Sequence, residues 1–93
     1  MNEIEQFHDG RLLGCELDWA SGELVVQIRL HSGEKSVRCL GVKDLSISRQ
    51  EEWGSSGSVD SLEISDSDNL KELIIEIQSG DILKCRCERV KEI

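Results

Sequence analysis

The sequence predicts an all-β fold: an antiparallel meander of about seven short strands that forms a small sandwich or a partly open barrel. Ser-Gly-acid triplets at 21–23, 32–34 and 79–81 are typical of hairpin turns, because glycine readily adopts the positive φ that tight turns require. Runs that alternate apolar and polar residues adjoin these triplets, for example at 24–30 and 82–87. Such alternation indicates strands with one buried face, so the runs and the turns predict the same architecture.

The chain has 93 residues, which is the length of a single domain, 1–93. Residues 1–10 form a polar lead-in. Strands are expected after it at 11–19, 23–31 and 36–40. Alternation places Leu13, Cys15, Leu17 and Trp19 on the buried face of the first strand, and Leu24, Val26, Ile28 and Leu30 on that of the second.

Gly41 is expected to mark a bend, since the alternation restarts after it at 42–48 with Leu45 and Ile47 inward. Residues 49–58 follow as an irregular loop that has two glycines and no regular apolar face. Further strands are expected at 59–64, 70–78 and 81–90, and the last three residues are expected to fray. The composition of 70–78 also suits a helix, but its β-branched residues and alternation favour a strand.

Charge limits the classes of partner. The chain carries 19 acidic and 11 basic residues, a formal net charge of −8 at pH 7. The acidity concentrates in 51–72, where Lys71 is the one basic residue. A negative field repels phosphate backbones and anionic lipid, so we expect no nucleic-acid or membrane partner, whereas a basic protein partner is compatible. The alternative, that the acidic side chains only keep a small domain soluble, stays open.

No apolar run approaches the roughly 18–20 residues of a membrane span, and the first residues do not resemble a secretory signal. We therefore expect a cytoplasmic protein. The four cysteines are Cys15, Cys39, Cys85 and Cys87. Cys85 and Cys87 lie two apart on one predicted strand, share a face and cannot easily bridge each other, so we expect free thiols in small apolar positions.

The residue patterns of common catalytic and ligand sites are incomplete. The histidines and cysteines lack the paired spacing of a structural zinc site, and Asp66 and Asp68 lack the glycine and distal glutamate of a calcium loop. The chain also lacks a nucleophile elbow and a phosphate-binding loop. We therefore predict no catalytic residues, no cofactor and no metal.

The irregular loop is the predicted contact site for a partner protein. Trp53 lies at its centre, and a tryptophan in a loop either plugs one end of a sandwich or anchors a partner. Both alternatives stay open. The predicted contact residues are Arg49, Glu51, Glu52, Trp53 and Ser55, because the segment is long, irregular and acidic.

Three short motifs add a resemblance to a protein group. They are Phe7-His8-Asp9-Gly10-Arg11-Leu12, Arg49-x3-Trp53-Gly54-x-Ser56 and Gln78-Ser79-Gly80-Asp81. With them the chain resembles small single-domain bacterial all-β proteins, some uncharacterised and some similar to immunity proteins of polymorphic-toxin systems. The resemblance implies a cytoplasmic, non-enzymatic protein that neutralises a partner by binding it.

The functional hypothesis is thus a non-enzymatic protein-binding module, in its finer form an immunity-like inhibitor. The alternative is a small-molecule or metal-binding β-barrel, with or without enzymatic activity. A ligand barrel requires an apolar cavity with a few polar groups inside, and its ligand or metal would be found bound to the purified protein.

Overall fold

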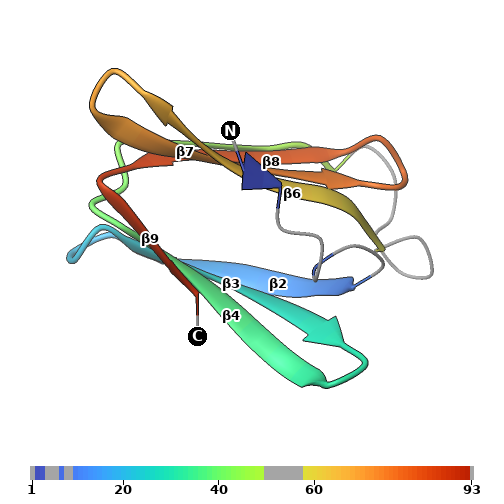
Figure 1. The fold of residues 1–93 in the computed structure, drawn as a ribbon. Helices are drawn as coiled ribbons and strands as arrows, with labels where there is room; N and C mark the ends of the chain where they lie inside the picture. The colour runs from blue at the N-terminus through green and yellow to red at the C-terminus, as the bar shows by residue number, and fades with distance from the viewer. Residues whose placement is uncertain (1, 4–6, 8–9, 50–57, 93) are drawn as a thin grey trace.

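The computed structural model confirms the all-β prediction and resolves the choice between sandwich and barrel. It describes residues 2–3, 7, 10–49 and 58–92, and these form two facing antiparallel sheets that do not close into a barrel (Figure 1). The strands are β1 (Asn2–Glu3), β2 (Arg11–Asp18), β3 (Glu23–Leu30), β4 (Gly33–Leu40), β5 (Asp44–Ile47), β6 (Val59–Ser67), β7 (Leu70–Ile77), β8 (Ile82–Cys87) and β9 (Arg89–Glu92).

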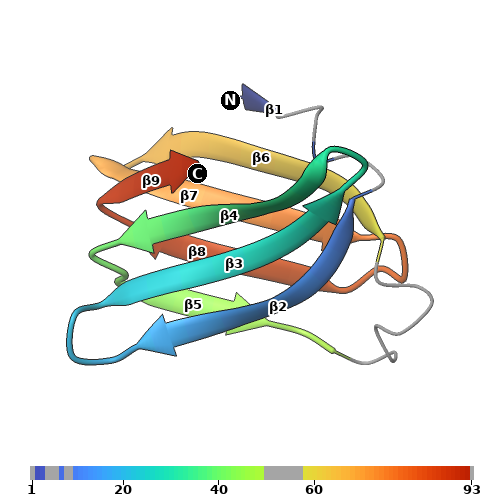
Figure 2. The same cartoon turned by 90° about the horizontal axis from the view of Figure 1, so that it is seen from below.

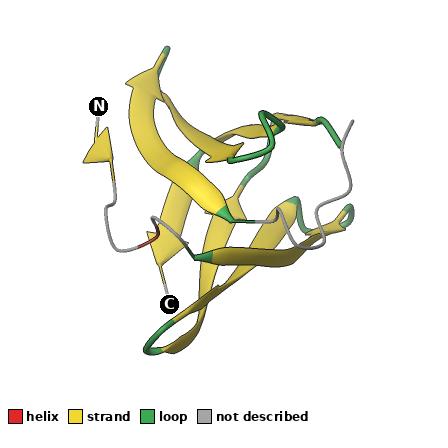
Figure 3. Cartoon of the chain, turned by 90° about the vertical axis from the view of Figure 1, so that its right-hand side faces the viewer, coloured by secondary structure: helices red, strands yellow, loops and turns green. Residues whose placement is uncertain are grey.

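The five-stranded sheet has the order β1-β6-β7-β8-β5, and the four-stranded sheet has the order β2-β3-β4-β9. Short loops join most of the strands (Figure 3). β1, which pairs with β6, lies within the predicted polar lead-in. β9, which pairs with β4, begins within the predicted strand 81–90 and runs beyond it to Glu92. The expectation that the chain frays from residue 91 is wrong for Lys91 and Glu92, because they pair with Arg38 and Val37.

The core lies between the sheets and consists of the predicted alternating rows. In β3, Leu24, Val26 and Ile28 are fully buried, which confirms that row, while Leu30 is half-buried. The other buried apolar side chains of the described residues are Phe7, Leu12, Val37, Cys39, Val59, Leu62, Leu73, Ile75, Ile77, Leu83, Cys85 and Cys87. A core built from aliphatic and cysteine side chains fits a chain with three aromatic residues.

The predicted row of β2 is wrong in part, because the strand contains a bulge. The pairing with β3 passes from Leu12–Ile28 to Gly14–Gln27, so one extra residue reverses the alternation. Leu12 is therefore buried and Leu13 is exposed, whereas Cys15 keeps its contact with the core. Leu17, near the end of the strand, is 36% exposed, contrary to the prediction. Trp19 lies beyond the end of the strand, in the turn, with 89% of its surface exposed.

In β5 the alternation is only half realised. Leu45 is half-buried and packs against the core, but Ile47 is 40% exposed, contrary to the prediction. The strand ends next to the β7–β8 turn, where Asp81 is buried and accepts hydrogen bonds from the hydroxyls of Ser48 (3.1 Å) and Ser79 (3.0 Å). This polar contact fixes the end of β5 against the predicted 79–81 hairpin.

The predicted bend at Gly41 is a crossing from one sheet to the other. Gly41 has a φ of 66° and separates β4, in the four-stranded sheet, from β5, in the five-stranded sheet. The predicted strand 81–90 is likewise divided at Glu88, where the chain crosses back from β8 to β9. Both crossings lie at the same end of the sandwich (Figure 2), and the Glu88 amide donates to the Leu40 carbonyl at 2.9 Å. We call Gly41 and Glu88 together the double crossing.

The described residues contain no helix of the length and apolar character needed to span a bilayer.

Candidate functional site

Of the predicted contact residues, the structure describes Arg49 alone, which is exposed and follows β5. Glu51, Glu52, Trp53 and Ser55 lie outside the described residues, so the predicted loop site stays a prediction. Two other features of the described residues could carry function: an apolar groove beside Trp19, and a group of three cysteines in the core.

The groove lies between β2 and β5, and each of these strands is at the edge of its sheet. It has a volume of about 350 Å³, within the lower part of the range for ligand sites. Its lining residues are Leu17, Trp19, Gly22, Val42, Lys43, Asp44 and Leu45. Most of this surface is apolar, and the tryptophan ring stands at its rim.

The β2–β3 turn holds Trp19 at this position. A carboxylate oxygen of Asp18 accepts hydrogen bonds from the amides of Ala20 (3.0 Å) and Ser21 (3.4 Å), and the Gly22 amide donates to the Asp18 carbonyl at 2.8 Å. The Gly22 carbonyl in turn accepts from the Val42 amide at 2.9 Å. The turn is therefore tied both to itself and to the chain at the double crossing, so the exposed indole projects from a well-braced backbone.

The charged groups near the groove are of both signs. Asp44 accepts a hydrogen bond from Arg86 at 3.3 Å, and Lys43 lines the groove beside it. Glu16 and Asp18 are exposed on β2. Among its lining residues the groove has no histidine, cysteine or serine, so they offer no nucleophile paired with a base. The arrangement suits binding by apolar contact and charge.

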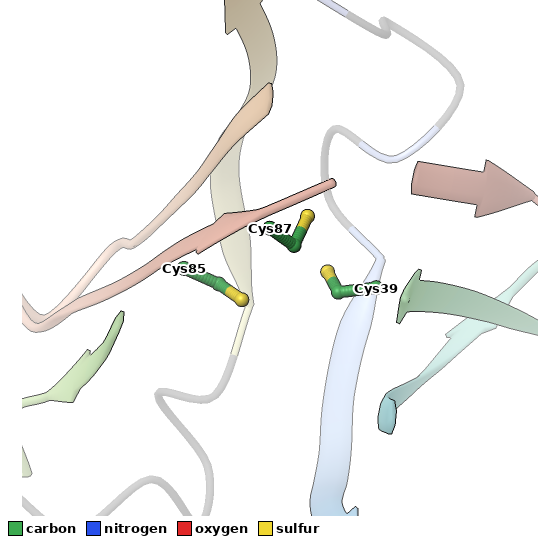
Figure 4. Close-up of side chains that lie close together, drawn as sticks. All are labelled: Cys39, Cys85 and Cys87. Carbon is green, nitrogen blue, oxygen red and sulfur yellow. The ribbon is translucent and has the colours of Figure 1, made fainter. Parts of the chain in front are cut away.

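The three cysteines lie in the core at the double crossing. Cys39 projects from β4, and Cys85 and Cys87 project from β8, so the two sheets contribute sulfurs to one cluster (Figure 4). All three residues have no exposed surface, and their Sγ atoms lie within 4.8 Å of one another. The fourth cysteine, Cys15, is half-buried on β2, and all four are free thiols. We call Cys39, Cys85 and Cys87 the thiol cluster.

The pKa values of the three sulfurs of the thiol cluster depend on one another, because the sulfurs lie close together in an enclosed space. Hydrogen bonds to Cys85 and Cys87, together with burial, raise the pKa of Cys39 far above its usual range. A hydrogen bond to Cys39 lowers the pKa of Cys85, but the bond to Cys87, burial and the neighbouring charge raise it overall. Hydrogen bonds from Cys39 and Cys85 lower the pKa of Cys87. The Cys87 thiol itself donates to the Arg89 carbonyl at 3.3 Å.

The sequence alone predicts part of the thiol cluster and part of the groove beside Trp19. Cys85 and Cys87 are two apart, so their common inward face is predicted, but their meeting with Cys39 depends on how the two sheets pack. The exposure of Trp19 follows from its place in the turn after β2, which ends at Asp18, and alternation alone does not predict that end. The Ser-Gly turn that follows Trp19 is the one local sign that the tryptophan leaves the strand.

No protein-family model matches the chain, and no curated protein matches it. Among solved structures, the fold is similar to the crystal structure of an uncharacterized protein from Neisseria gonorrhoeae. The TM-score is 0.74 and the sequence identity is 15%, over 98% of this chain and 94% of that chain. At this identity the likeness shows a shared fold over nearly the full length of both chains and carries no assignment of activity.

Proposed function

We propose that the chain is a non-enzymatic protein-binding module that takes an extended, basic segment of a partner protein into the groove between β2 and β5. The observation that carries the proposal is Trp19, which is 89% exposed at the rim of this groove. Tryptophan is usually well covered in folded proteins, and it is among the residues most enriched at the centres of protein interfaces. Because hydrogen bonds already order the turn that carries Trp19, less conformational entropy is lost when a partner binds.

The extended form of the partner follows from the sheet edges. β2 and β5 each pair with one strand among the described residues. Apart from the bridge of Arg11 to Ser58 at the start of β2, one side of each backbone is therefore open to a further strand. A peptide added to such an edge gains main-chain hydrogen bonds along its length, and its alternate side chains enter adjoining pockets. A groove of about 350 Å³ admits a few such side chains next to the indole.

The basic character of the partner follows from charge. The chain has a net charge of −8, and the exposed side chains of Glu16 and Asp18 stand on β2, the strand that the partner would extend. Attraction between the acidic chain and a basic partner segment increases the rate of association and helps to fix the register of the added strand. Added salt should therefore slow association more than it speeds dissociation, because salt screens exposed charges.

The finer form of the proposal is inhibition, in which the partner is a toxin that the module neutralises. The motifs that resemble immunity proteins favour this form. The alternative of a ligand-binding barrel has less support, because the two sheets do not close around a cavity. The protein encoded beside this gene is the first partner to test for the inhibitory form: a large secreted toxin there favours it.

A display library of random linear peptides tests the proposal without a known partner. Selection on the wild-type protein, with counter-selection on Trp19→Ala, should enrich peptides that alternate apolar residues with lysine or arginine. These peptides should lose about 2 kcal/mol or more of binding free energy on Trp19→Ala. They should bind Ile82→Ala normally, because Ile82 is an apolar residue, 42% exposed, outside the groove lining. Enrichment of peptides that bind both variants equally would contradict the proposal.

A further inference from the structure

The spacing of the thiol cluster is close to that of a metal site. A metal–sulfur bond of about 2.3 Å places the three sulfurs of a trigonal site about 4 Å apart. The Sγ atoms of Cys39, Cys85 and Cys87 all lie within 4.8 Å of one another, so a contraction of under about 1 Å brings them to this distance. Rotation of the side chains about their Cα–Cβ bonds can supply it without movement of the backbone.

The kind of ligand restricts the kind of ion. Three cysteine sulfurs are soft ligands, which exclude magnesium, calcium and manganese and select zinc, Cu(I) or an iron–sulfur cluster. No carboxylate or imidazole of the described residues belongs to the group. An iron–sulfur cluster generally requires four protein ligands, and its bulk does not fit between sulfurs that are already this close.

The number of ligands favours Cu(I) over zinc. Structural zinc sites are almost always four-coordinate, and catalytic sites fill the fourth position with water. The three cysteines have no exposed surface, so they leave no path for a water ligand, and the described residues supply no fourth side chain. Cu(I) forms stable complexes with a coordination number of two or three when its ligands are sulfurs. A site without access to water also protects the ion from oxidation.

We propose that Cys39, Cys85 and Cys87 form a binding site for one Cu(I) ion in the core, at the double crossing between the two sheets. Binding displaces protons from the thiols to solvent. Loss of two protons, with the third sulfur kept as a thiol, leaves the occupied site with a net charge of −1, the smallest charge that retains two thiolate bonds. This proposal departs from the expectation of no metal and is independent of the groove.

Anaerobic titration of the reduced full chain with Cu(I), in competition with a Cu(I) chelator of known affinity, tests the site. We expect one ion per chain and an X-ray absorption spectrum with sulfur ligands alone. Cys39→Ser and Cys87→Ser should each weaken binding by about 100-fold or more, equivalent to about 2.7 kcal/mol. Cys15→Ser is the matched control and should bind Cu(I) like the wild type, because Cys15 lies outside the cluster.

Thermal unfolding of the wild-type protein keeps the proposal falsifiable if a serine variant fails to fold. The folded state holds the three sulfurs together, whereas the unfolded chain offers them only as flexible thiols. One equivalent of Cu(I) should therefore raise Tm, and one equivalent of Zn(II) should raise it less. Three results would overturn the proposal: no rise in Tm with Cu(I), an equal or larger rise with Zn(II), or wild-type affinity in a folded Cys39→Ser or Cys87→Ser protein.

Discussion

Ile28 and Gln27 are neighbours in β3 with opposite environments, which makes them a matched pair for testing the core. Ile28 is fully buried between the sheets and Gln27 is exposed. Ile28→Ala should lower the free energy of unfolding by about 2–5 kcal/mol, because it removes buried methyl groups and leaves a cavity. Gln27→Ala should change it by less than about 0.5 kcal/mol. Urea denaturation measures both values, and similar losses would show that the face assignment is wrong.

Asp66 reports the local electrostatics of the β6–β7 hairpin. Its carboxylate forms a hydrogen bond and ion pair with Lys71 directly across the hairpin, and this interaction lowers the pKa of Asp66. A lowered pKa means that the pair stabilises the folded state at pH values above the unfolded carboxyl pKa of about 3.9. That contribution is lost as the pH falls through the lower pKa of the folded state.

The corresponding prediction is that Lys71→Gln raises the pKa of Asp66 toward its ordinary value, as followed by NMR titration of the Asp66 carboxyl carbon. Lys84→Gln is the control, since Lys84 lies nearest Glu72 and not Asp66. An unchanged Asp66 pKa in the Lys71 variant would show that the hairpin pair does not persist in solution. Because the carboxylate is exposed, high salt should reduce the difference between wild type and variant.

The double crossing depends on glycine at position 41. The residue has a positive φ of 66°, and a Cβ at this position would lie 2.1 Å from a carboxylate oxygen of Glu88. Gly41→Ala should therefore destabilise the fold by about 1–2 kcal/mol through backbone strain, with a further loss from displacement of Glu88. Gly14→Ala should have little effect, because a Cβ at Gly14 meets no atom within 4 Å.

The Glu88→Ala background separates the two causes. In that background the penalty of Gly41→Ala should fall but persist, because the φ constraint remains after the side chain is removed. Chemical denaturation of the four proteins in this cycle gives the coupling energy. A zero coupling would show that the Glu88 side chain moves aside freely, and an absent residual penalty would show that position 41 does not keep its left-handed conformation.

The two sheets together predict a pattern of hydrogen-exchange protection. β3, β7 and β8 pair on both sides, whereas β2 and β5 are edges among the described residues. Amides of Val26 and Ile75 should exchange at least about 100-fold more slowly than the unpaired alternate amides of 15–18 in β2. NMR-detected exchange gives these rates. Equal protection throughout β2 and β3 would mean that another strand covers the β2 edge in solution.

The sequence predicted the local parts of this structure and missed those that depend on distant pairing. The inward rows of β3 and β7 were predictable because each hairpin brings sequence neighbours together, and alternation reports one buried face. The exposure of Trp19 was not, because alternation continues the predicted strand to Trp19, whereas β2 ends at Asp18 and Trp19 lies in the turn. The bend at Gly41 was visible, but the exchange of sheets was not, since it requires the pairing of β4 with β9 and of β5 with β8.

The same limit applies to the candidate sites. The spacing of Cys85 and Cys87 predicts that both side chains point to the same face of their strand. Cys39 lies close to them only because the two sheets pack face to face. The groove forms between β2 and β5, two strands that do not pair with each other. Contacts between strands that do not pair with each other produce no periodic pattern in a single sequence. The contact site was therefore predicted in the irregular loop 49–58 and not at the groove.

β9 completes the four-stranded sheet last during synthesis. The ribosome releases β2, β3 and β4 early, but β4 receives its outer neighbour, and Cys39 its cover, only when residues 82–92 have emerged. Until then the nascent chain presents an apolar row and an unpaired strand edge, the two features that favour aggregation and recruit chaperones. Final closure of this fold is therefore a late event, and a chain that terminates before Arg89 would remain in the vulnerable state for its whole lifetime.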